Sequence, residues 1–194
     1  MSISAEAAWP GRRRLPGDLA MWFFILAELA VFGILILAFA VAQALQAQTF
    51  HAGRQALDAS MGLALTLSLL TAGLCAALAV VRVRAGRRGG VALLLAALAC
   101  ASGYVVLKLG EYHHLARQGL GLEHDTFFTL YWILTGFHFL HVLLGMLMLG
   151  WMAWRCRAGV YGPGHCTGME SGVLYWHMVD LVWVLLFPVV YLLG

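Results

Sequence analysis

The chain has 194 residues, of which 62% are hydrophobic and only 11% are charged. Soluble domains carry about 25% charged residues, because a core of this size still leaves many residues facing water. The composition therefore excludes an ordinary soluble domain and indicates a protein whose solvent is lipid. The formal net charge of +3 is too small and too dispersed to indicate a nucleic-acid partner.

Five stretches are long and apolar enough to cross a membrane, which takes about 20 residues. They cover residues 19–42, 59–81, 91–111, 126–154 and 172–193. The segments between them are polar or rich in glycine, and all are too short to form a soluble domain. The sequence therefore predicts an all-α, polytopic transmembrane helical bundle of five spans, forming a single domain over residues 1–194.

The basic residues predict how the bundle is inserted. Residues 19–42 follow a basic tail, but this apolar run is far longer than the roughly 7–15 residues of a signal-peptide core, so we interpret it as a retained span. Basic residues of short loops favour the cytoplasmic side, which predicts a cytoplasmic N-terminus. Nine of the 12 Lys and Arg fall on the side of the N-terminal tail: Arg12, Arg13, Arg14, Arg82, Arg84, Arg87, Arg88, Arg155 and Arg157.

Glu28 lies near the middle of the first span, about 14 Å along the helix from Leu19. A carboxyl group at that depth costs several kcal/mol unless it is paired, hydrated or neutralised. Phe24 and Phe32 flank it at i−4 and i+4, so its own helix face is otherwise apolar. Two interpretations stay open: a protonated Glu28 hydrogen-bonded between helices, or a residue that handles protons or borders a lipid cleft.

The third span ends in Lys108, Glu111 and Tyr112. Lys108 and Glu111 are three residues apart and can pair along a helix, and both side chains can reach the membrane surface. The adjacent His113 and His114 point to different faces of a helix, which argues against a joint metal site. We therefore predict a solvated interface for Lys108, Glu111 and Tyr112.

Polar residues also form stripes on the last two spans. His138 and His141 lie three residues apart on the fourth span. They could ligate metal or haem, or they could hydrogen-bond between helices that approach closely at Gly145. On the fifth span, His177 and Asp180 could bond each other along the helix. We predict that these stripes form an interior polar network; its members are Thr135, His138, His141, Glu170, His177 and Asp180. The sequence contains no CxxCH haem attachment and no Walker loop.

Several strings resemble the cytochrome c oxidase subunit III family, over about residues 16–193. YWHMVDLVW at 175–183 resembles that family's YWHFVDxVW signature, and TGFHFLHV at 135–142 resembles its TGxHxxHV stretch. Glu111 and Tyr112 resemble its EY pair, and Glu170 matches the Glu that precedes YWH. WFFILAELAVF at 22–32 resembles the helix that carries a buried Glu, in the place of Glu28.

This resemblance implies a non-catalytic accessory subunit of a haem–copper terminal oxidoreductase in the respiratory chain. In that family, subunit III holds no haem or copper, packs on the haem-containing catalytic subunit, and borders a proton-uptake route. Its phospholipid-filled cleft lies near the buried Glu, so Glu28 would be the cleft carboxyl and the polar stripes would be interior hydrogen-bonders. We accordingly expect no catalytic residue, no metal-binding residue and no cofactor of its own, a bound phospholipid, and location in the bacterial inner membrane.

Members of the mitochondrial type have seven spans, so the family's cleft must here be incomplete or closed by another chain. In having five spans, the chain is similar to the third subunit of bacterial quinol oxidases and to the accessory protein of nitric oxide reductase. Three alternatives therefore stay open. They are an accessory subunit of nitric oxide reductase, a di-haem carrier using His138 or His141 with His177, and an independent proton-coupled transporter using Glu28 and Asp180.

Overall fold

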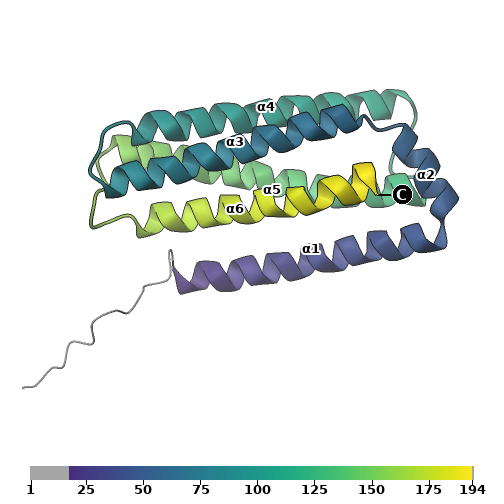
Figure 1. Ribbon diagram of the computed structural model, residues 1–194, viewed down its shortest axis with the longest axis horizontal. Helices are drawn as coiled ribbons and strands as arrows, with labels where there is room; N and C mark the ends of the chain where they lie inside the picture. Colours follow the sequence, from purple (N-terminus) through teal and green to yellow (C-terminus); the bar gives the residue numbers. More distant parts are fainter. Residues whose placement is uncertain (1–17, 194) are drawn as a thin grey trace, which may run out of the picture.

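A computed structural model describes residues 18–193 as a bundle of long helices (Figure 1). The elements in chain order are α1 (Leu19–Leu45), α2 (Ala47–Gln55), α3 (Ala59–Arg84), α4 (Gly90–Arg117), α5 (Thr126–Arg157), α6 (Thr167–Phe187) and a π-helical turn, η1 (Pro188–Leu192). Five of these helices are long and apolar enough to cross a membrane, which confirms the predicted five-span, all-α bundle. The Arg12–Arg14 cluster lies outside the described residues, and the cytoplasmic N-terminus stays a prediction.

The helices extend beyond the apolar stretches because polar residues at their ends continue the helical backbone hydrogen bonds. Helix α4 runs to Arg117 and is followed by Gly119, whose φ of 75° ends it. The Asp125 side chain caps α5 by accepting the Phe128 N–H at 2.8 Å. At Pro188 the missing N–H interrupts the α-helical ladder, and the chain continues as η1.

Helix α2, which occupies a segment that reads as a polar linker, closes one end of the bundle between α1 and α3 (Figure 1). Phe50 of α2 packs edge-on against Phe39 of α1 and Phe127 of α5, with ring centroids 5.0 and 5.4 Å away. The Arg54 guanidinium donates to the carbonyl oxygen of Val190 at 3.3 Å. Together these contacts join the end of α1 to α5 and to η1.

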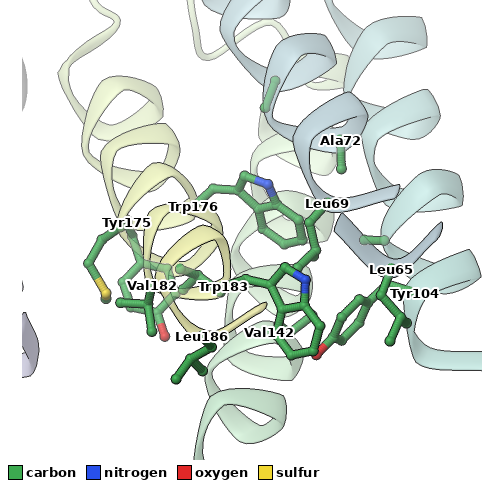
Figure 2. Packing of buried hydrophobic residues seen from close by; sticks show 14 of the residues in the cluster. Leu65, Leu69, Ala72, Tyr104, Val142, Tyr175, Trp176, Val182, Trp183 and Leu186 are labelled. Atoms are coloured by element: carbon green, nitrogen blue, oxygen red, sulfur yellow. The ribbon is translucent and has the colours of Figure 1, made fainter. Parts of the chain in front are cut away.

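Large aromatic side chains fill the space between α6 and the helices that face it (Figure 2). Trp176, Trp183 and Tyr104 have no exposed surface. The Trp183 indole N–H donates to the Thr66 hydroxyl at 3.0 Å, so this buried polar group is satisfied. A Cβ on Gly145 would lie 2.8 Å from the Trp176 indole, which confirms that Gly145 permits the close approach of α5 and α6.

Candidate functional site

A closed group of ionisable and hydroxyl side chains lies inside the bundle. The Lys108 ammonium is fully buried and lies 2.7 Å from Oε2 of Glu111, whose side chain is 8% exposed. Lys108 also donates to the hydroxyls of Tyr131 at 3.1 Å and Tyr191 at 3.0 Å, so its three N–H groups all have acceptors. The Tyr191 hydroxyl donates to Oε1 of Glu111 at 2.8 Å. We call these four residues, from α4, α5 and η1, the Lys108 cluster.

The predicted solvated interface at Lys108 and Glu111 is wrong, whereas their predicted pairing is confirmed. Helix α4 continues past both residues to Arg117, and they face α5 and η1 rather than the membrane surface. Snorkelling is unnecessary because the ion pair and the hydroxyls satisfy both groups inside the bundle. Four rings also lie within 5.6 Å of the ammonium, close enough for cation–π attraction. They belong to Tyr112, Tyr131, Trp183 and Tyr191.

Tyr112 and Thr135 continue the polar contacts from the Lys108 cluster along α5. The Tyr112 hydroxyl donates to Oγ1 of Thr135 at 3.0 Å, and Thr135 donates to the Tyr131 carbonyl oxygen at 2.6 Å. Thr135 is fully buried, as predicted for an interior residue. The Tyr112 ring packs on that of Trp132, with centroids 4.6 Å apart, so Tyr112 is also not freely solvated.

His138 is fully buried and joins three helices through its two ring nitrogens. Nε2 lies 3.0 Å from the carbonyl oxygen of Val179, and since a carbonyl can only accept, Nε2 carries the proton. Nδ1 must then accept, and the Tyr104 hydroxyl 3.2 Å away donates to it. Haem ligation by His138 would require the loss of one of these hydrogen bonds.

Glu28 of α1 pairs with His141 of α5, an interhelical contact that the sequence did not specify. Oε2 of Glu28 lies 3.0 Å from Nε2 of His141, and Nδ1 of His141 donates to the Phe137 carbonyl oxygen at 2.8 Å. Because Nδ1 already carries a proton, the bond between Nε2 and Oε2 must contain one more. The pair is therefore a neutral carboxyl donating to imidazole, or a carboxylate accepting from imidazolium, and it has no net charge in either form.

His177 and Asp180 pair along α6, as predicted, with 3.2 Å between Nδ1 and Oδ2. Both groups lie over Gly73 of α3, where a Cβ would overlap Oδ2 of Asp180. The Asp180 side chain is 10% exposed, whereas that of His177 is 44% exposed. The prediction that His177 belongs to the interior is therefore wrong: its ring contacts α3 on one side and is exposed on the other, at the outer surface of the bundle.

Glu170 also lies outside the interior network in which it was predicted. It belongs to the first turn of α6, which begins at Thr167, and so lies at one end of the bundle. Its carboxylate accepts from the Arg84 guanidinium, with 2.6 Å between Oε1 and the nearest nitrogen, and the Arg84 side chain is half exposed. This ion pair joins the end of α3 to the start of α6.

The predicted residues thus fall into separate groups rather than one network. Among residues 18–193, no hydrogen bond joins the His177–Asp180 pair to either histidine of α5. Sequence reasoning missed Tyr104, Tyr131 and Tyr191. A signal for Tyr104 existed, because it precedes Lys108 by four residues and so shares its helix face. Within the described part of the chain, no three His, Cys, Asp or Glu side chains are close enough to hold a metal ion.

The sequence of the chain matches a known protein family. The chain matches the family model for cytochrome c oxidase subunit III over residues 13–194, nearly its whole length. The chain belongs to the cytochrome c oxidase subunit III family. The resemblance of the strings at 175–183 and 135–142 is therefore confirmed, and these subunit III signatures supply the packed faces of α6 and α5.

Relatives within the subunit III family come from several kinds of oxidase. The cytochrome bo(3) ubiquinol oxidase subunit 3 of Pseudomonas putida is 28% identical over 177 residues, covering 91% of this chain and 85% of that protein. The quinol oxidase subunit 3 of Bacillus subtilis is 26% identical over 177 residues, covering 91% and 86%. The heme-copper oxidase subunit I+III of Aeropyrum pernix is 30% identical over 180 residues, covering 89% of this chain and 22% of that protein.

Proposed function

We propose that this chain is a non-catalytic accessory subunit of a haem–copper terminal oxidase, packing on the haem-containing catalytic subunit and supporting its stability and proton uptake. The observation that carries the proposal is the subunit III family match over residues 13–194. The Aeropyrum pernix relative adds support, because its name joins a subunit I and a subunit III of a heme-copper oxidase in one protein.

The hydrogen bonds of the histidines in the membrane-spanning helices support a role without electron transfer. Both ring nitrogens of His138 and both of His141 are already engaged by groups of this chain. A di-haem carrier would need free imidazole nitrogens that face each other across the bundle. The oxidation and reduction proposed for the complex therefore belong to the partner subunit.

The Glu28–His141 pair supports a contribution to proton uptake. The pair shares one proton between Oε2 and Nε2, and moving that proton from one atom to the other changes no net charge. The proton can therefore move between the two residues at membrane depth without creating an isolated charge. Glu28 is 20% exposed and His141 11%, so the pair borders the surface of the bundle.

The same proposal places the N-terminus in the cytoplasm and the chain in the bacterial inner membrane. Basic residues of the loop after α3 and of the loop after α5 gather at one end of the bundle. A pocket lined by Arg87, Arg88, Cys156 and Tyr161 lies between these two loops. Positive charge concentrated at one end favours the cytoplasmic side for that end.

Purification of the C-terminally tagged chain from its own membranes tests the proposal. In mild detergent a larger haem-containing polypeptide should co-elute with the chain, seen as a Soret band, and deletion of the gene should lower oxygen consumption by the membranes. The complex should reduce oxygen; consumption of nitric oxide instead would identify a nitric oxide reductase accessory subunit. A colourless chain that transports solute alone in liposomes would refute the proposal in favour of a transporter.

A further inference from the structure

An ionisable pair lies at the outer surface of the bundle, well inside the length of an apolar helix long enough to cross a membrane. His177 is ten residues past Thr167, the start of α6, which corresponds to about 15 Å along the helix. Leu192, the other end of this span, is about 22 Å further along, so His177 lies within a hydrocarbon core of about 30 Å centred on the span. At that depth neither water nor lipid headgroups can solvate an imidazole.

Apolar side chains surround this pair on the exposed surface. Each is at least 42% exposed, and together with His177 they define what we call the His177 face: Leu70 and Leu74 of α3, and Leu181 and Val184 of α6. Asp180 lies at its edge, against Gly73 of α3. The face is therefore an apolar surface with one polar group at its centre.

The imidazole of His177 is incompletely bonded, in contrast with the other two span histidines. His138 and His141 each have hydrogen bonds at both ring nitrogens. His177 is bonded at Nδ1, to Asp180, and among residues 18–193 no hydrogen bond reaches its Nε2. In hydrocarbon no water can bond this nitrogen, so leaving it without a partner is costly, and the bundle alone supplies none.

The protonation of the pair defines what must face Nε2. Asp180 has no other hydrogen-bond partner in the described chain, so its carboxyl is either ionised or donates to Nδ1. At membrane depth a net charge is disfavoured, and the pair is therefore neutral overall. A neutral pair carries a proton on Nε2 in both cases, so Nε2 is a donor and requires an acceptor oxygen.

We propose that the His177 face binds a transmembrane helix of the catalytic subunit, and that this helix presents a hydroxyl, amide or carboxyl oxygen to Nε2 of His177. The inference rests on the proposed function and adds to it the surface by which the chain binds its partner. Lipid acyl chains have no polar group at this depth. A second copy packed two-fold on the same face would place one Nε2 donor against another, which leaves both unsatisfied.

Site-specific photo-crosslinking in native membranes tests the location of the interface. A photoreactive phenylalanine derivative placed at Leu70 or Leu181 should crosslink the haem-containing polypeptide. The same group at Val106 of α4 or Leu147 of α5, which are 70% and 71% exposed on other faces, should not. Crosslinks to the haem-containing polypeptide only from Val106 and Leu147, or crosslinks between copies of this chain, overturn the inference. Absence of any co-purifying haem polypeptide refutes instead the proposed function on which the inference rests.

Variants of His177 test the hydrogen bond itself. His177→Leu should reduce haem retained per chain after detergent washing by about threefold to about twentyfold, the range expected for one hydrogen bond between membrane helices. His177→Gln keeps an N–H donor and should retain the partner. Because His177 is half exposed, both variants should keep wild-type helix content by circular dichroism. Equal retention in His177→Leu and wild type, or equal loss in both variants, would overturn the proposed bond.

Discussion

Replacing Lys108 with methionine would remove a buried cation and leave the Glu111 carboxyl without its partner. Methionine has a similar length and no charge, so the substitution changes electrostatics more than packing. The wild-type ammonium makes three hydrogen bonds in the Lys108 cluster and lies within 5.6 Å of four aromatic rings. None of these contacts can be replaced by water, because the Lys108 side chain has no exposed surface.

The expected cost of Lys108→Met follows from this burial. Removing one partner of a buried ion pair destabilises a protein by about 3–5 kcal/mol, because it leaves an uncompensated charge. The double variant Lys108→Met/Glu111→Gln removes both charges and keeps an acceptor for Tyr191, so we expect it to recover at least about half of that loss. Unfolding of the purified chain by sodium dodecyl sulfate in mixed micelles, followed by tryptophan fluorescence, measures both values.

A matched control lies on the opposite side of the same helix. Val106 is 70% exposed, and Val106→Ala should change the free energy of unfolding by no more than about 0.5 kcal/mol. A loss below about 1 kcal/mol for Lys108→Met would show that the ion pair is not buried as described. A double variant as unstable as the single one would show that the uncompensated Glu111 charge is not the cause.

Three further substitutions have expected outcomes. Gly145→Leu should lower the free energy of unfolding by about 1–3 kcal/mol, because its Cβ meets the Trp176 indole at 2.8 Å; Gly136→Ala, with open space around it, is the control. Glu28→Gln should keep the yield of the haem-containing complex within about twofold of wild type, because the amide can still donate to its histidine partner. Asp180→Ala should lower that yield more than Glu28→Gln does, because it leaves Nδ1 of His177 without a hydrogen bond inside the membrane. Equal yields for the two variants would contradict this order.

The number and approximate position of the spans could be predicted because hydropathy is a property of each segment alone. The ends of the helices could not, because they depend on local capping and on polar turns that continue the ladder. Helix α4 runs to Arg117, past the apolar stretch, and α2 forms in a segment that reads as a polar linker. Burial of Phe50 against α1 and α5 stabilises that short helix, and this contact is tertiary rather than local.

The burial of Lys108 could not have been predicted from the sequence, because nearly every residue of the stretch at 91–111 is apolar and no face of the helix stands out. In the structure the buried residues of α4 recur with alternating spacings of four and three; they are Gly90, Leu94, Ala97, Ala101, Tyr104, Lys108, Glu111 and Leu115. This is the heptad spacing of a helix seam that faces other helices. Lys108 and Glu111 continue that seam, so the spacing places them inside the bundle, whereas their nearness to the end of the apolar stretch misleadingly indicates the membrane surface.

The pairing of Glu28 with His141 could not be predicted by any such spacing. Sequence position fixes the depth of each residue, because every residue advances a straight helix by about 1.5 Å. It does not fix which neighbour the helix face meets, and these two partners are 113 residues apart. The same reasoning explains His177: its depth and its bond to Asp180 are local, but its exposure depends on which helices lie beside α6. The sequence therefore gives the depth of a polar residue in the membrane but not the residue that bonds it. His177 differs from His138 and His141 because, within the described chain, one of its ring nitrogens has no partner.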